Sequence, residues 1–257
     1  MLRILKNTYL LCFVVILYFP ITVLILNSFN HSKLSIGWEG FTLGWYLKLF
    51  ESPIIIKSMK NSIIIGFLSA FFSSFIGTIA SFGFYRYRYK GRKIIFFFIQ
   101  TMITFPDIVL GISLALLFTI FKLGFGFFSL LISHIILTLP FAIMLLITGF
   151  KDLDKNILEA GKDLGANDFN ILIKIILPLI YPNILAAFLI CFTLSLDDVL
   201  VSFFVSGPHF EVLPITIFSL ARMGVKPEVN AICTLMLIIS VILIVFSQLL
   251  LKKQTND

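Results

Sequence analysis

The sequence predicts an all-α integral membrane protein with six transmembrane helices. Of its 257 residues, 59% are hydrophobic and only 13% are charged, and the mean hydropathy is +1.06. A soluble domain has about 45–50% apolar and about 25% charged residues, so this chain is too apolar to be one. The apolar runs are continuous rather than alternating, which excludes the short strands of a transmembrane barrel.

Six apolar runs are long enough to cross a bilayer, which takes about 20 helical residues. They cover residues 9–29, 61–85, 94–121, 127–150, 183–204 and 230–251. The first run follows a basic start, but it is longer than the roughly 7–15 residues of a signal-peptide core and lacks a small-x-small cleavage site. We therefore expect a retained helix and one transmembrane domain over residues 1–257.

The distribution of Lys and Arg predicts that both termini face the cytoplasm. The net charge is +7, and cytoplasmic flanks of membrane helices carry an excess of basic residues. The denser basic set comprises Arg3, Lys6, Arg86, Arg88, Lys90, Arg92, Lys93, Lys151, Lys155, Lys162, Lys174, Lys252 and Lys253. A membrane location explains this charge without a nucleic-acid partner, and it places the loop at 151–182 in the cytoplasm.

That cytoplasmic loop is polar between two apolar runs, and it predicts two short helices. The first spans Asp152 to Leu164, followed by a turn at Gly165 and a cap from Asn167 or Asp168. The second should turn Phe169, Leu172, Ile173 and Ile176 inward and end at Pro178 and Pro182. Periodicity alone fits either an interfacial amphipathic loop or a docking element for a cytoplasmic partner.

Three acids lie in or beside the predicted spans: Asp107, Asp197 and Asp198. A carboxylate at the centre of a membrane helix costs on the order of 2.5–3.5 kcal/mol, so such residues are functional candidates. Asp107 follows Pro106, so it could instead cap a broken helix. Asp197 and Asp198 point about 100° apart on a helix, so at most one faces a pathway directly and the other could make a structural hydrogen bond.

The three acids, with Ser195 nearby, favour a water-lined path for a cation. A long, multiply charged amine suits dispersed carboxylates, whereas a metal ion requires oxygens within one coordination shell. We therefore predict no metal site. Three further expectations follow: His134 is a hydrogen-bonded interior residue, Cys12, Cys191 and Cys233 are buried free thiols, and Trp45 is either an interface anchor or a gate for the amine.

Several fixed spacings in the loop resemble the EAA loop of ABC importer permeases. Glu159-Ala160-Gly161 is followed by Gly165 after three residues and by Ile175-x-Leu177-Pro178 after nine more. Gly161 stands where that family usually has Ala. The resemblance implies a type I importer permease fold and a coupling helix that docks into an ATPase subunit. The implied coupling residues are Glu159, Ala160, Gly161, Asp163, Gly165, Ala166, Leu177 and Pro178.

Motifs along nearly the whole chain are similar to the PotC-type permease subunits of spermidine/putrescine ABC importers. They are NSFN at 27–30, GWY at 44–46, YRYRY at 85–89, PDIV at 106–109, SLDDV at 195–199 and GP at 207–208. The resemblance implies polyamine passage in a bacterial inner membrane. The implied pathway residues are Trp45, Asp107, Ser195, Asp197 and Asp198.

The implied partners are a PotB-type permease, an ABC ATPase homodimer and an external polyamine-binding protein. The sequence contains no GxxxxGK[ST] phosphate loop, so ATP and Mg²⁺ are expected on the ATPase and no cofactor on this chain. Two alternatives remain open. One is an importer permease for another solute, such as putrescine alone, thiamine or iron. The other is a stand-alone ion-coupled carrier or channel that uses the same acids as a relay.

Overall fold

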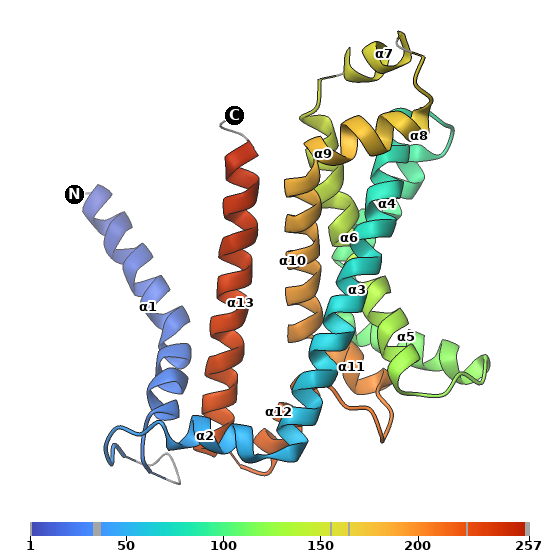
Figure 1. The fold of residues 1–257 in the computed structure, drawn as a ribbon. Coiled ribbons are helices and arrows are strands. Elements are labelled where there is room, and N and C mark those ends of the chain that lie inside the picture. Colours follow the sequence, from blue (N-terminus) through green and yellow to red (C-terminus); the bar gives the residue numbers. More distant parts are fainter. Residues whose placement is uncertain (1, 33–36, 155, 164, 225, 255–257) are drawn as a thin grey trace. The chain divides into compact units, whose positions relative to one another are not determined.

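The part of the chain that the structure describes is helical, which confirms the predicted class. The computed structural model describes residues 2–32, 37–154, 156–163, 165–224 and 226–254 (Figure 1). Four helices are long and apolar enough to cross a bilayer alone: α1 (Leu2–Ser28), α3 (Pro53–Arg86), α6 (Phe127–Lys151) and α13 (Pro227–Gln254). Two bent helix pairs also qualify when each is taken as one span, so the number of spans is between four and six.

The chain divides into two compact units. The first unit comprises Met1–Lys57 with Thr216–Ile239, and the second comprises Ser58–Ile215 with Ser240–Asp257. In the first unit, the end of α1 is joined to α2 (Gly44–Glu51) by a hydrogen bond of 2.7 Å between the hydroxyls of Ser28 and Tyr46. The ring of Phe29 stacks on that of Phe41, with 5.3 Å between the ring centroids.

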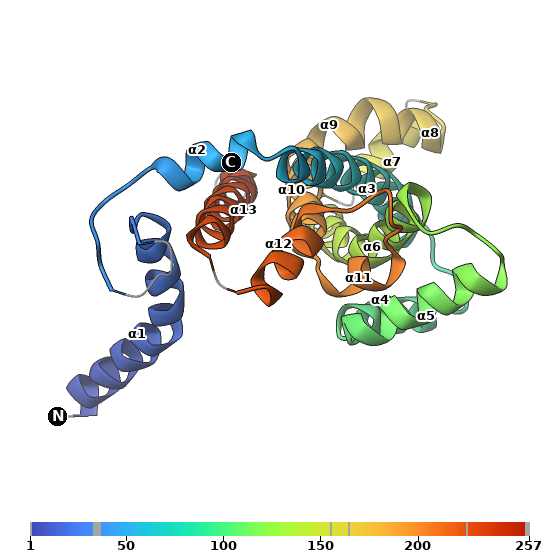
Figure 2. The ribbon, with the colours of Figure 1, turned by 90° about the horizontal axis from the view of Figure 1, so that it is seen from below.

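The second unit is a bundle built around α6. The helices α4 (Arg92–Ile103) and α10 (Tyr181–Asp197) pack on α6, and α11 (Leu200–Val205) packs on both α6 and α5 (Asp107–Ile120) (Figure 2). Leu114, Phe118, Leu130, Val201 and Val205 form a buried cluster between these helices. The helix α12 (Leu213–Arg222) begins in this unit and continues into the first.

Two predicted spans are wrong as single helices. The run at 94–121 is divided into α4 and α5, which meet at 106°, because Pro106 cannot continue the hydrogen-bond ladder of a helix. The run at 183–204 begins earlier, at Tyr181, and is interrupted after Asp197. There Asp198 has an extended backbone conformation, and α11 starts at Leu200. Both interruptions therefore lie beside acids.

The loop at 151–182 contains the two predicted short helices with changed limits. The first, α7 (Asn156–Asp163), begins four residues later than predicted, because a side-chain oxygen of Asp154 accepts a hydrogen bond from the Asn156 amide. Gly165 has φ +77° and donates its amide to the Lys162 carbonyl at 2.8 Å, which confirms the turn. The Asn167 side chain caps α8 (Asp168–Ile171) by accepting from the Asn170 amide. Lys155 and Leu164 lie outside the described residues.

The predicted inward face of the second loop helix is partly wrong. Ile171 and Ile176 are fully buried, whereas Phe169 is 67% exposed and Ile173 is 44% exposed. The cause is a π-helical turn at Leu172–Ile176, whose wider spacing shifts the buried positions relative to an α-helix. The short helix α9 (Leu177–Leu179) follows, and the chain bends by 73° before α10, which carries Pro182 in its first turn.

Small residues allow close helix packing in the second unit. A Cβ atom added to Gly77 would lie 3.1 Å from the Cβ of Ala142. One added to Gly149 of α6 would lie 2.6 Å from the side-chain amide of Asn183 on α10. Membrane helices gain little from hydrophobic burial against one another, so such close contacts supply much of their packing energy.

The cysteine prediction is correct for one residue and wrong for another. All three thiols are free, and Cys191 is buried in the packed part of the bundle. Cys12 is exposed on α1, because no described part of this chain covers that stretch of the helix, and Cys233 is half-buried.

We expect Gly149→Ala to destabilise the protein. The added methyl group overlaps the Asn183 side chain, and overpacking of a close contact costs about 1–3 kcal/mol. The measurement is thermal unfolding of the detergent-solubilised protein. Gly83→Ala is the control, because a Cβ at that helical position meets no atom within 4 Å. Equal melting temperatures for the two variants would contradict the importance of this contact.

Candidate functional site

Each of the two helix interruptions carries predicted pathway acids. Asp107 is the first residue of α5, directly after Pro106, and Asp197 is the last residue of α10. The interruptions are close to each other because α5 packs on α11. Interrupted membrane helices are where transporters commonly build binding sites, since free backbone groups and side chains meet there.

Asp198 is buried and caps the helix that follows it. Its two carboxylate oxygens accept the backbone amides of Val201 at 3.1 Å and Ser202 at 2.8 Å, and the residue is only 8% exposed. These amides begin α11 and have no partner within the helix. Asp198 therefore makes the structural hydrogen bond that the sequence allowed for one of the two adjacent acids.

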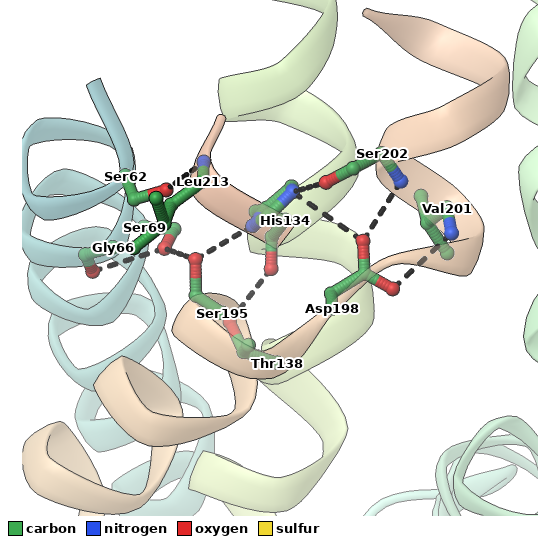
Figure 3. Close-up of polar contacts among 10 residues, drawn as sticks. All are labelled: Ser62, Gly66, Ser69, His134, Thr138, Ser195, Asp198, Val201, Ser202 and Leu213. Carbon is green, nitrogen blue, oxygen red and sulfur yellow. Dashed lines mark hydrogen bonds and ion pairs between the residues drawn. The ribbon is translucent and has the colours of Figure 1, made fainter. Parts of the chain in front are cut away.

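A buried hydrogen-bond network connects Asp198 to three further helices, as Figure 3 shows. The Nδ1 atom of His134 on α6 lies 2.6 Å from the Ser195 hydroxyl, and its Nε2 atom lies 2.9 Å from the Ser202 hydroxyl. The same Nε2 atom is 3.6 Å from a carboxylate oxygen of Asp198. Ser69 on α3 extends the network by donating to Ser195 at 3.1 Å. The expectation that His134 is a hydrogen-bonded interior residue is confirmed.

Asp197 points away from this network. Its side chain is exposed and accepts the hydroxyl of Ser240 on α13, at 3.0 and 3.1 Å to the two carboxylate oxygens. Asp107 is also exposed. The two adjacent acids thus have different surroundings, because Asp197 ends α10 whereas Asp198 lies beyond the helix in an extended conformation. Asp197 and Asp107 are accessible from outside the chain, whereas Asp198 and Ser195 are not.

Trp45 belongs to the first unit, apart from the other four pathway candidates in the second. Its indole nitrogen donates to the backbone carbonyl of Asn30 at 2.7 Å, and the residue is 8% exposed. The Lys48 ammonium lies 4.6 Å from the centre of the ring. The ring of Trp45 is thus buried and already contacts a cation of this chain.

The predicted coupling residues form the outer surface of the loop, with one exception. Glu159, Ala160, Asp163, Gly165 and Pro178 are exposed, and Ala166 and Leu177 are half-buried. Gly161 is buried, and a Cβ atom there would lie 3.0 Å from the Ile171 side chain. The glycine in place of the usual alanine therefore lets α7 lie close against α8.

A polar cluster joins the same loop to the end of α3. The Asp168 carboxylate accepts from the Arg86 Nε at 3.2 Å and from the Tyr87 hydroxyl at 3.0 Å, and the Lys162 ammonium lies 4.0 Å away. The hydrogen bond to this carboxylate raises the pKa of the Tyr87 hydroxyl, so the hydroxyl keeps its proton and remains a donor. We call Asp168, Arg86, Tyr87 and Lys162 the Asp168 cluster.

Sequence reasoning missed the roles of Ser69, Ser202 and the Asp168 cluster. Ser202 carried a signal, because it stands in the first turn after Asp198, where an N-cap carboxylate accepts backbone amides. Ser69 lies 126 residues from Ser195 in the chain, and no local pattern connects them.

The helical bundle with interrupted membrane spans and an exposed loop is the class of fold that the comparisons with known proteins also find. The sequence profile described as "Binding-protein-dependent transport system inner membrane component" matches residues 73–256, and the chain belongs to this family. It is 42% identical to the "Spermidine/putrescine transport system permease protein PotC" of Escherichia coli (strain K12), covering 99% of this chain and 96% of that protein.

Two further similarities agree with this family. The chain is 35% identical to the "Putrescine transport system permease protein PotI" of the same strain, over 86% of this chain and 81% of that protein. A bacterial ABC transporter involved in the import of the acidic polysaccharide alginate contains a chain with the same fold. The TM-score is 0.69 at 18% identity, covering 94% of this chain and 93% of that one.

We expect Asp198→Ala to lower stability by about 0.5–2 kcal/mol, because it removes the cap of α11. Asp198→Asn should retain only part of this stability, since its single amide oxygen can accept one of the two backbone amides. Thermal unfolding in detergent measures both variants, with Asp197→Ala as the control for the loss of an exposed carboxylate. A stability of Asp198→Ala equal to that of wild type would show that the cap contributes nothing.

Proposed function

We propose that this chain is a permease subunit of an ATP-driven importer that moves polyamines, spermidine or putrescine, into the cytoplasm. The observation that carries the proposal is 42% identity over 99% of the chain to a spermidine/putrescine permease. Exposed carboxylates at two neighbouring helix interruptions support it. Such acids attract a cationic solute and disfavour an anionic one.

The proposed pathway uses Asp107 and Asp197 as the groups that meet the amine. Both are accessible from outside the chain, and they lie at separate positions, as a row of amino groups requires. Asp198 and Ser195 do not meet the amine in this proposal. They position the pathway acids, because they hold the interrupted helix to His134. Trp45 remains a proposed pathway residue on the family resemblance alone, and an amine would have to displace Lys48 from its ring.

The proposed coupling route passes from α7 into the bundle. Gly161 contacts Ile171, which belongs to a buried cluster with Phe82 of α3 and Phe150 of α6. The Asp168 cluster makes a second connection, to the end of α3. A displacement of α7 at the exposed Glu159 would therefore be transmitted to α3 and α6 through packed and hydrogen-bonded side chains. ATP drives the cycle because it binds the states of the ATPase with different affinity.

We further propose one permease domain over residues 1–257, with six spans, both termini in the cytoplasm and a multi-pass location in a bacterial inner membrane. In this arrangement the partners are a second, PotB-type permease subunit, an ABC ATPase homodimer that holds ATP and Mg²⁺, and an external polyamine-binding protein. The chain itself performs transport and no covalent chemistry, with no cofactor or metal of its own.

Two alternatives give different outcomes in a transport experiment. A permease specific for putrescine alone is supported by the 35% identity to a putrescine permease. A stand-alone ion-coupled carrier would transport without an ATPase and would not need Glu159 on an exposed loop helix. Uptake of spermidine as well as putrescine would exclude a permease for putrescine alone. Dependence of that uptake on the ATPase would exclude a stand-alone carrier.

The first test measures uptake of labelled spermidine and putrescine in cells that lack any other polyamine importer. Deletion of the gene should abolish uptake. Asp107→Asn and Asp197→Asn should each lower uptake about tenfold or more, because hydrogen bonds to charged groups contribute about 1.5–3 kcal/mol. Glu51→Gln removes an exposed carboxylate at the end of α2 and serves as the control. Full uptake by both Asp variants would remove these acids from the pathway.

The second test addresses the coupling surface. Glu159→Lys should leave the protein inserted but lower uptake and the ATP hydrolysis that the loaded binding protein stimulates. The reason is that reversing one charge in a docked surface places like charges together, which costs several kcal/mol. The matched control is Glu51→Lys, the same charge reversal outside the loop. Normal stimulated hydrolysis and uptake with Glu159→Lys would contradict docking through this face.

A further inference from the structure

A basic pocket lies where three apolar helices of the second unit have neighbouring ends. Two adjoining cavities of about 270 and 370 Å³ share four lining residues: Phe84, Arg92, Ile147 and Lys151. Arg88 lines the first cavity, and Lys93 lines the second. These residues come from the end of α3, the start of α4 and the end of α6, except Arg88, which lies between α3 and α4. We call the two cavities together the α3–α4–α6 pocket.

The floor of this pocket is apolar and firmly packed. Phe84 is 5% exposed and forms a buried cluster with Ile143 and Ile147. The ring of Phe96 packs edge-on against Phe84, with 6.3 Å between centroids. Phe150, which is 1% exposed, completes the wall of the first cavity. The pocket therefore has apolar walls below and cationic side chains around them.

The four cations of the pocket are not neutralised within the described part of the chain. No ion pair with a carboxylate joins Arg88, Arg92, Lys93 or Lys151 among the described residues, whereas Arg86, on the same segment, pairs with Asp168. The Arg92 guanidinium instead lies 5.8 Å from the centre of the Phe84 ring.

The start of α4 adds to the positive potential. Gly91 precedes this 12-residue helix and offers no side chain to cap its first amides. A helix start carries a partial positive charge, and Arg92 and Lys93 are the first two residues of α4. Four like charges and a helix start held close together repel one another unless an anion binds between them.

We propose that the α3–α4–α6 pocket binds the phosphate group of an anionic membrane lipid. The cations contact the phosphate oxygens, and the apolar part of the lipid rests on Phe84, Ile147 and Phe150. Free inorganic phosphate shares the headgroup chemistry, but the apolar lining and the place of the pocket at the ends of membrane helices match a lipid. The inference depends on insertion in a membrane and not on polyamine as the solute.

The test places the purified importer in nanodiscs of phosphatidylcholine with a minor fraction of phosphatidylglycerol and counts retained lipids by native mass spectrometry. Wild type should retain phosphatidylglycerol. Arg88→Gln with Lys151→Gln should lower its affinity about fivefold for each cation removed, because a basic residue near the bilayer surface contributes about that much attraction. Lys151→Gln alone is a milder variant that can be used if the double variant inserts poorly. It should lower the affinity for phosphatidylglycerol about fivefold, as expected for one cation.

The matched control is Lys90→Gln. Lys90 lies between Arg88 and Arg92 on the same exposed segment but lines neither cavity. If Lys90→Gln lowers the affinity for phosphatidylglycerol as much, the lipid is attracted by the basic surface in general. That result would overturn the proposal of a specific lipid site in the pocket. A last experiment adds inorganic phosphate to the protein in neutral detergent and measures the melting temperature. If phosphate alone raises the melting temperature as much as phosphatidylglycerol does, the ligand is a free phosphate and the lipid assignment is wrong.

Discussion

The buried contact between His134 and Asp198 is the constraint on which the second unit depends. It belongs to a network of buried side chains that connects α3, α6, α10 and α11. Polar groups in so apolar a setting are costly unless every member is hydrogen-bonded, so the network specifies one arrangement of these helices. The interruption at Asp198 is thereby fixed in position, and with it the directions of both adjacent carboxylates.

Asp197 and Asp198 are adjacent in the sequence but differ in their physical roles. Helix geometry alone predicts that neighbouring acids face different surroundings. The structure assigns the buried surroundings to Asp198 and the accessible surroundings to Asp197. A charge that must meet a solute and a carboxylate that must hold a helix need not be the same group. Because the two residues are adjacent, the hydrogen bonds that hold Asp198 also fix the position of the exposed Asp197.

Features with a local cause could be predicted from the sequence, whereas features with a distant cause could not. The apolar runs, the turn at Gly165 and the cap at Asn167 each depend on neighbouring residues. The end of α10 at Asp197 depends on partners from α6, and the buried face of the loop depends on a π-helical turn that no periodic pattern indicates. Asp107, Asp197 and Asp198 could be singled out from the sequence because a charge in an apolar run is rare. Ser69 was missed because serine is unremarkable there.

The π-helical turn at Leu172–Ile176 has a consequence for the evolution of the loop. Such a turn is equivalent to one additional residue in an α-helix. Deleting a single residue there would rotate everything on the amino-terminal side by about 100° relative to α10. The surface offered to a partner would then turn toward the bundle, although every individual side chain would be unchanged. Length in this short segment is therefore under stricter constraint than composition, and substitutions should be tolerated where insertions or deletions are not.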